Sequence, residues 1–333
     1  MMILSNVMIG EIKMGLAVIL IVVGFVLLIK GADFLVEGSS NIAKKFHIPE
    51  IIIGLTVVSI GTSMPELFVS VTSALSGYSD MAIGNAVGSN ICNLLLILGL
   101  SAVIKPVKFQ RETRIIEIPM CLIITVIFMI LCNLGTGISK IDSIILIGLF
   151  ILFILYTIFM GIKGEQFDRE DNRATPKDDF NNDISIMKSI IFVILGAIGL
   201  KIGGDFTVDN SVIIAEHFNI SEQIISLTIL AIGTSLPELV TSVTAAIKGD
   251  SDIAIGNIIG SNIFNMLLII GVSAFIKPIV YNPTYNIQMI ILLFGTILLA
   301  LFPMIPPKNE MNKPNGIIYL TAYFIYMIML FKV

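Results

Sequence analysis

Apolar residues follow one another along this chain in long blocks, separated by short polar stretches. Many blocks are close to 20 residues long, which is the length that a helix needs to cross the hydrocarbon core of a bilayer. They lack the strict alternation of lipid-facing strands, and a helix satisfies its own backbone hydrogen bonds in lipid. The pattern predicts an all-α polytopic membrane protein with ten transmembrane helices, at about residues 15–43, 50–75, 81–104, 115–134, 141–162, 187–215, 223–247, 253–276, 287–304 and 316–331.

The second half of the chain repeats the first at an offset of 172 residues. Residues 61–66 read Gly-Thr-Ser-Met-Pro-Glu and residues 233–238 read Gly-Thr-Ser-Leu-Pro-Glu, and 34 of the 53 positions from 54 to 106 are identical in the second copy. Five crossings in each half is an odd number, so the second half enters the membrane from the opposite side. We therefore predict two inverted five-helix repeats, at 1–162 and 187–333, joined by a polar linker at 163–186.

The composition excludes a soluble globular protein. Hydrophobic residues make up 56% of the 333 residues and charged residues 13%, and the mean hydropathy is +0.98. The net charge of −4 gives no indication of a nucleic-acid partner, and nothing implies an obligatory protein partner; the lipid bilayer is the expected surrounding. Three cysteines lie in apolar segments without metal-ligand spacing, which favours a packing role for Cys92, Cys121 and Cys132.

Lysine and arginine are distributed unequally between the two sets of loops. The face with both termini has four of them, and the opposite face has fourteen. By the positive-inside rule, both termini lie outside and the central linker is cytoplasmic, in a multi-pass protein of the plasma membrane.

Each half has a carboxylate and a proline within a predicted crossing. A carboxylate in the membrane costs about 3 kcal/mol or more, so Glu66 and Glu238 need a compensating interaction such as a bound cation. Pro65 and Pro237 each remove a backbone N–H and free carbonyl oxygens in the preceding turn. Carbonyl, hydroxyl and carboxylate oxygens together favour Na⁺ or Ca²⁺ over softer metals.

The next crossing in each half contains the pattern Gly-Ser-Asn-x-x-Asn, at 88–93 and 260–265. Its serine and its second asparagine are four residues apart, so both side chains lie on one face of a helix. The other asparagines of these crossings can face the ions or join helices by hydrogen bonds, and the sequence leaves both roles open. They are Asn85, Asn90, Asn257 and Asn262.

Small and charged residues mark the first crossing of each half. Gly24, Gly31 and Gly38 are seven residues apart and share a helix face, where they allow either tight static packing or sliding against the core. Lysine and aspartate three or four residues apart predict ion pairs within one helix, at Lys30–Asp33 and Lys201–Asp205.

The doubled motifs resemble the two alpha-repeats of the cation/calcium exchanger superfamily, and most of all those of archaeal and bacterial sodium/calcium exchangers. This resemblance implies a secondary antiporter, not an enzyme, without cofactors, whose transported ions are Na⁺ and Ca²⁺. Asn265 stands where certain members have Asp, which puts potassium dependence in doubt. The implied ion ligands are Ser59 (carbonyl), Thr62, Ser63, Glu66, Ser89 and Asn93, and Ala231 (carbonyl), Thr234, Ser235, Glu238, Ser261 and Asn265.

The sequence therefore favours electrogenic exchange of Na⁺ for Ca²⁺ by alternating access. The alternative on the same fold is an exchanger of Ca²⁺ or another divalent cation for protons, in which the glutamates carry the protons. An intramembrane hydrolase is disfavoured because His47 and His217 lie at helix ends and no His-Glu-x-x-His motif occurs. A passive channel would show flux without a counter-ion.

Overall fold

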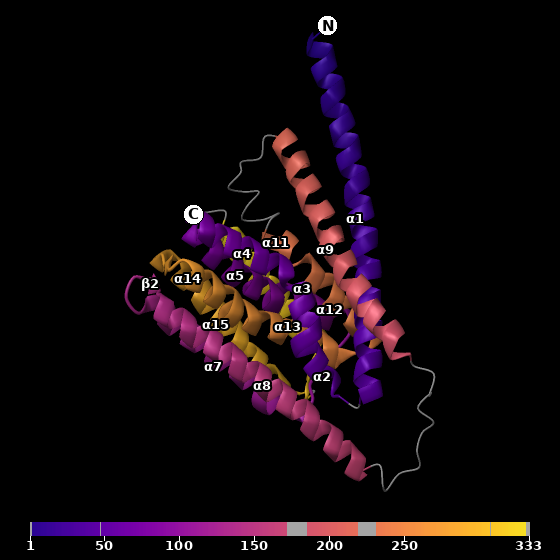
Figure 1. Ribbon diagram of the computed structural model, residues 1–333, viewed down its shortest axis with the longest axis vertical. Helices are drawn as coiled ribbons and strands as arrows, with labels where there is room; N and C mark the ends of the chain where they lie inside the picture. Colours follow the sequence, from indigo (N-terminus) through magenta and orange to yellow (C-terminus); the bar gives the residue numbers. More distant parts are fainter. Residues whose placement is uncertain (1, 47, 172–184, 219–230, 307, 331–333) are drawn as a thin grey trace.

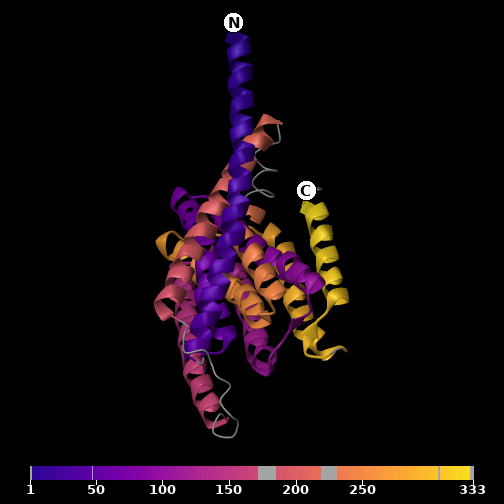
Figure 2. The ribbon, with the colours of Figure 1, turned by 90° about the vertical axis from the view of Figure 1, so that its right-hand side faces the viewer.

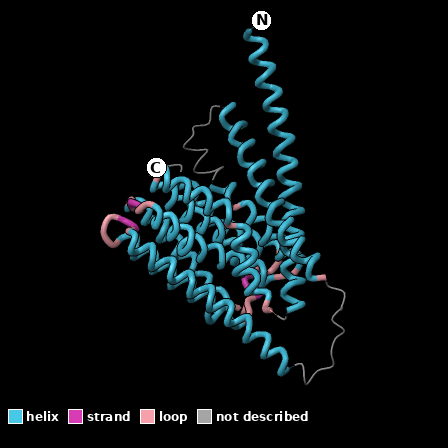
Figure 3. Tube along the Cα trace, viewed as in Figure 1, coloured by secondary structure: helices cyan, strands magenta, loops and turns pink. Residues whose placement is uncertain are grey.

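The computed structural model describes residues 2–46, 48–171, 185–218, 231–306 and 308–330. Within these ranges the chain is helical, apart from short loops and four two-residue strands (Figure 3). The elements up to the central linker are α1 (Met2–Phe46), α2 (Glu50–Ile53), η1 (Gly54–Val58), α3 (Ser59–Thr62), α4 (Met64–Ser76), α5 (Ser79–Ile91), η2 (Cys92–Leu98), α6 (Gly99–Ile104), β1 (Val107–Lys108), η3 (Thr113–Glu117), α7 (Ile118–Asn133), β2 (Gly137–Ile138) and α8 (Lys140–Asp171).

The elements after the linker largely repeat this order. They are α9 (Ile186–His217), α11 (Ala231–Thr234), α12 (Leu236–Lys248), α13 (Ser251–Phe264), η5 (Asn265–Ile269), α14 (Ile270–Ile276), β3 (Ile279–Val280), η6 (Pro283–Tyr285), α15 (Asn286–Leu301), η7 (Phe302–Met304), β4 (Glu310–Met311) and α16 (Lys313–Leu330).

The described residues contain seven helices that are long and apolar enough to cross a membrane, or eight if the bent segment 50–76 is one span. This confirms an all-helical polytopic membrane protein. Of the ten predicted crossings, the one at 223–247 lies partly outside the described residues. Helix α16 corresponds to the last predicted crossing, but it is less apolar than the seven helices counted above. Helix α8 extends to Asp171, so the linker predicted from 163 begins as helix; its part at 172–184 is outside the described residues.

Two long spans form the centre of the bundle. In the most apolar 18 residues of the span formed by α5 to α6, 72% are buried, and in those of the span formed by α13 to α14, 83% are buried. The corresponding share is 22% in each of α1, α8 and α9. The outer helices present apolar side chains outward, as lipid requires. Cys92, Cys121 and Cys132 are buried in the main apolar core, which confirms their packing role.

Helices α1 and α9 run side by side along one edge of the molecule, and the N-terminal end of α1 extends beyond the other helices (Figures 1 and 2). The glycines of the first crossing face α9. A Cβ atom on Gly31 would lie 2.8 Å from the backbone nitrogen of Leu200, and one on Gly38 would lie 2.6 Å from the Ser189 carbonyl oxygen. The glycine face thus joins α1 to α9, and these two helices form one tightly packed unit.

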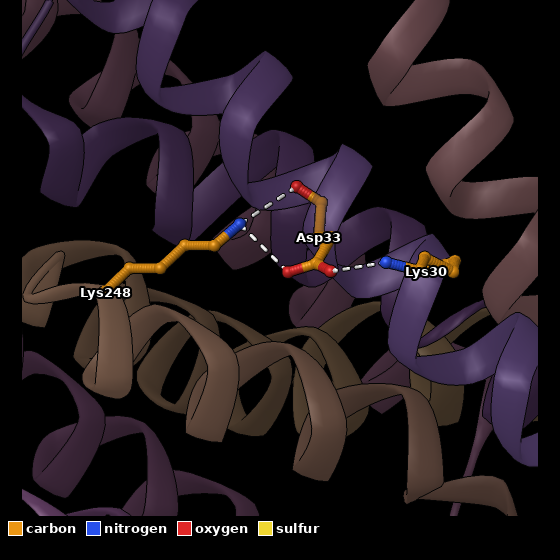
Figure 4. A network of polar contacts seen from close by, with 3 residues as sticks. All are labelled: Lys30, Asp33 and Lys248. Carbon is orange, nitrogen blue, oxygen red and sulfur yellow. Dashed lines mark hydrogen bonds and ion pairs between the residues drawn. The ribbon is translucent and has the colours of Figure 1, made fainter.

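One ion-pair network connects this unit to the core. Lys30 and Asp33 of α1 are 3.8 Å apart, and Lys201 and Asp205 of α9 are 2.6 Å apart, so both predicted pairs are confirmed. Asp33 has a further partner that was not predicted, because Lys248 at the end of α12 reaches its carboxylate at 3.1 Å and its carbonyl oxygen at 3.3 Å (Figure 4). The position that corresponds to Lys248 in the first repeat is Ser76.

The short strands join loops that are distant in sequence. β1 pairs with β4, and β2 pairs with β3, both antiparallel. Each pair therefore brings together two loops that the crossing pattern assigned to the same face of the membrane.

Candidate ion-binding site

The helix break predicted at each proline is present in both repeats. In the first repeat, the axis of 50–62 is bent by 51° relative to that of 64–76. Ser63 and Ser235 stand at the breaks with nearly the same backbone angles, φ −86° and ψ 10° for the first and φ −87° and ψ 6° for the second. Pro65 and Pro237 follow within the first turn of the new helix, where a missing N–H costs little.

The two glutamates are at the start of the helices that follow the breaks. Glu66 lies in the first turn of α4 and Glu238 in the first turn of α12, and each residue is only 1% exposed. The positive end of a helix dipole stabilises a carboxylate in its first turn, which offsets part of the cost of burial. None of the ion pairs among the described residues includes either glutamate. Within the described part of the chain, these two buried carboxylates thus have no side-chain cation as a partner.

Hydroxyl groups cross from each repeat to the glutamate of the other. Ser63 Oγ donates to Glu238 Oε1 at 2.7 Å, and Ser235 Oγ donates to Glu66 Oε1 at 3.3 Å. Ser63 Oγ is also 2.9 Å from Ser261 Oγ. The two breaks, separated by 172 residues in sequence, therefore form one polar centre.

The threonines beside the breaks bond to asparagines of the opposite repeat. Thr62 Oγ1 donates to Asn257 Oδ1 at 3.0 Å, and Thr234 Oγ1 lies 3.4 Å from Asn85 Oδ1. A hydroxyl that donates in this way keeps its lone pairs available to a cation.

These two asparagines are held in turn by serines of their own repeat. Asn257 donates to Ser242 Oγ at 2.8 Å, and Asn85 donates to Ser70 Oγ at 2.9 Å. The sequence left the role of Asn85 and Asn257 open and did not single out the serines. The spacing could have indicated them, because Ser70 and Ser242 each follow the glutamate of their repeat by four residues and so lie on the same helix face.

The second motif places its asparagines where the helix widens. Asn93 lies in the π-helix η2, and Asn265 begins the π-helix η5. Such segments interrupt the α-helical hydrogen-bond ladder and recur at functional sites. Both residues are buried, as are Asn90 and Asn262 one turn earlier.

Several buried oxygen atoms around this centre have no hydrogen-bond partner in the described part of the chain. A buried oxygen without a partner costs about 1–3 kcal/mol, so this cluster calls for a ligand that accepts lone pairs. No group of three or more His, Cys, Asp or Glu side chains able to hold a metal occurs among the described residues, and the donor set is carboxylate, hydroxyl and amide oxygen. The unpartnered atoms are Glu66 Oε2, Glu238 Oε2, Ser89 Oγ, Asn93 Oδ1 and Asn265 Oδ1.

The carbonyl of Ser59 fits the predicted ligand set less simply. It accepts the Ser63 N–H at 3.0 Å, and the Thr62 hydroxyl, whose single hydrogen goes to Asn257 at 3.0 Å, lies 3.3 Å away. An ion that binds there uses the remaining lone pair of the carbonyl, beside the oxygen of the threonine hydroxyl. For Ala231, which begins α11, the hydrogen bonds of the carbonyl lie outside what the structure describes.

The sequence matches the family described as sodium/calcium exchanger protein twice, over residues 16–159 and 188–332. The chain is 35% identical over 330 residues to "Putative antiporter CaxA" of Alkalimonas amylolytica, covering 96% of this chain and 100% of that protein. It is 31% identical to "Sodium/calcium exchanger MaX1" of Methanosarcina acetivorans, covering 95% and 98%. Among solved structures, the sodium-calcium exchanger NCX_Mj soaked with Na⁺ and Ca²⁺ superposes with a TM-score of 0.81 and 32% identity, covering 94% of this chain and 98% of that one.

Proposed function

Because this chain belongs to the sodium/calcium exchanger protein family, we propose that it is a secondary antiporter that exchanges Na⁺ for Ca²⁺ across a membrane by alternating access. The observation that carries this proposal is the set of buried, unpartnered oxygen atoms contributed by both repeats around Glu66 and Glu238. Two carboxylates neutralise one divalent cation, and hard oxygen donors are the ligands that Ca²⁺ and Na⁺ prefer.

The proposed ligands are the twelve groups expected from the sequence. Of these, the two glutamates, Ser89, Asn93 and Asn265 have an oxygen without another partner among the described residues, which supports their role. The hydroxyls of Thr62, Ser63 and Ser235 donate to Asn257, Glu238 and Glu66, in that order, and their lone pairs can bind the ion. The remaining ligands of the proposal are Ser59 (carbonyl), Ala231 (carbonyl), Thr234 and Ser261.

The charge of the site sets the electrical character of exchange. One Ca²⁺ balances the two glutamates, whereas three Na⁺ on the same ligands leave one positive charge over. With this stoichiometry each cycle moves net charge, worth about 2.3 kcal/mol per elementary charge per 100 mV. We expect transport to depend on the membrane potential.

We further propose that the chain forms ten crossings, as two inverted five-helix repeats in the plasma membrane, with both termini outside. The two matches to one family model and the doubled helix breaks support a duplicated unit. Two inverted repeats that contribute related halves to one central site make outward-open and inward-open states similar in free energy.

The direct test is uptake of radioactive Ca²⁺ into proteoliposomes loaded with Na⁺. We expect uptake when the outside medium lacks Na⁺, and little uptake when Na⁺ is equal on both sides. Uptake that follows a proton gradient and ignores Na⁺ would instead support Ca²⁺/H⁺ exchange. Uptake that needs no counter-ion and does not saturate would indicate a channel.

The proposed orientation predicts a labelling pattern. A single cysteine at Thr175 is expected to react with an impermeant thiol reagent only from the cytoplasmic side, and one at Ser5 only from outside. The native cysteines are buried, so the unmodified protein serves as the unlabelled control. The reverse pattern would overturn the orientation.

Adding a third carboxylate should change ion dependence. In Asn265→Asp, the new carboxylate joins Glu66 and Glu238, and three carboxylates this close do not all stay ionised without a further cation or proton. We expect Ca²⁺ exchange to gain dependence on K⁺ or on pH between about 6 and 8, measured in the same vesicles. A variant that matches the wild type in K⁺ response, pH profile and Ca²⁺ affinity would show that Asn265 does not face the ions.

A further inference from the structure

Four asparagines form a hydrogen-bonded arrangement across the interface of the two repeats. Asn90 and Asn262 are fully buried, and Asn93 and Asn265 are each 1% exposed. In the last two the amide oxygen has no partner in the described part of the chain, although the amide nitrogen has one. The structure therefore gives each of these amides a defined direction.

A backbone carbonyl fixes that direction in the first pair. Asn90 Nδ2 donates to the Asn262 carbonyl oxygen at 3.2 Å, and a carbonyl oxygen only accepts. Asn90 Oδ1 is then turned toward Asn265, which donates to it through Nδ2 at 2.9 Å. With its nitrogen engaged, Asn265 presents Oδ1 on the other side.

The second pair repeats this order with the repeats exchanged. Asn262 Nδ2 lies 3.5 Å from the Asn90 carbonyl oxygen, and Asn93 Nδ2 donates to Asn262 Oδ1 at 3.1 Å. Asn93 Oδ1 is consequently the end of the side chain that remains free. Each orienting asparagine thus acts on the amide of the opposite repeat.

The direction of an amide matters for a cation because its two ends have opposite polarity. The oxygen coordinates a hard cation, whereas the NH₂ group presents donor hydrogens that repel it. A buried amide without a fixed partner can adopt two flipped orientations that occupy nearly the same space. Only the orientation that turns the oxygen toward the ion binds it.

From this geometry we propose that Asn90 and Asn262 are positioning residues for cation binding, which turn the oxygens of Asn265 and Asn93 toward the ions without binding the ions themselves. The inference rests on the proposed function, because it takes Asn93 and Asn265 as ion ligands. It assigns a role to Asn90 and Asn262, two of the four asparagines whose role the sequence left open.

The test uses the difference between an amide and a carboxylate. Asn90→Leu removes the orienting acceptor at similar volume, and we expect the dissociation constant for Ca²⁺, measured by equilibrium binding to the purified protein without Na⁺, to rise about tenfold. Ionised aspartate has two equivalent oxygens and needs no orientation, so the measurement is made above about pH 8, where the added carboxylate is charged. In an Asn265→Asp background, Asn90→Leu should therefore change the dissociation constant less than about twofold.

The repeat supplies a matched control. The loss caused by Asn90→Leu should persist in an Asn93→Asp background, because Asn90 does not orient Asn93. Asn262→Leu should behave in the opposite way, with suppression by Asn93→Asp and none by Asn265→Asp. A purely structural effect of the leucines would show no such pairing.

Each outcome bears on one of the two proposals. Equal losses in all backgrounds, or no loss, would overturn the positioning role. Absence of Ca²⁺ binding and exchange in the wild type would contradict the proposed function itself, and with it the ligand role of Asn93 and Asn265. If a leucine variant unfolds, Asn90→Ala and Asn262→Ala repeat the comparison, with folding checked by thermal unfolding.

Discussion

Replacing either buried glutamate by glutamine is expected to abolish Ca²⁺ exchange while the protein stays folded. Glutamine keeps the size and one oxygen of Glu66 or Glu238 but removes the charge, so a divalent cation meets one carboxylate in a site of low dielectric constant. Loss of one partner of a buried charge pair costs about 2–5 kcal/mol, and we expect Ca²⁺ affinity to fall about 30-fold or more.

The measurement is Na⁺-dependent Ca²⁺ uptake into vesicles over a range of Ca²⁺ concentrations. Glu112→Gln is the matched control, because Glu112 is exposed and outside the polar centre. Near-normal exchange by Glu66→Gln or Glu238→Gln would remove that glutamate from the site.

The second large effect is expected at the interface of α1 and α9. Valine at Gly31 would place its side chain against the backbone of Leu200 and Gly196, which cannot move aside as a flexible side chain would. Overpacking of this kind costs about 1–3 kcal/mol and here has to separate two helices. We expect Gly31→Val to lower the unfolding temperature and to reduce exchange.

The chain suits a thiol assay of unfolding, because it has no tryptophan and its three cysteines are buried. Unfolding in detergent would expose them to a thiol-reactive fluorophore. Gly15→Val, in the same helix, is the control, since nothing lies within 4 Å of a Cβ atom at that position. Equal unfolding temperatures for the two variants would argue against a tight contact at Gly31.

Features that depend on local spacing could be predicted from the sequence. A proline in an apolar block predicts a helix break, and both breaks occur where Pro65 and Pro237 require them. The pairs Lys30–Asp33 and Lys201–Asp205 follow from helix geometry alone. A proline acts on the turn that precedes it, and the members of each ion pair lie about one turn apart. The helical backbone therefore fixes both features without any contact between distant segments.

Features that depend on which helices meet could not be predicted in the same way. The spacing of Gly24, Gly31 and Gly38 defines a helix face, but it does not say that this face meets α9. The contact of Asp33 with Lys248 joins residues 215 positions apart. The same reason applies to the asparagine pairs, which form across the repeats and whose direction depends on the backbone carbonyls of Asn262 and Asn90.

The contact between Asp33 and Lys248 has a consequence for the balance of the proposed cycle. Two inverted repeats of identical sequence would give two access states of equal free energy, populated one to one. An ion pair that is formed in one access state and broken in the other removes that equality, and the pair Asp33–Lys248 has no counterpart in the other half, because Ser76 replaces Lys248 and Asp205 bonds to Lys201 of its own helix. A partly exposed pair contributes about 0.2–1 kcal/mol, which corresponds to a population ratio of about 1.4 to 5. One charge at the end of a helix, when it pairs in one state only, is thus enough to give a duplicated transporter a preferred resting side.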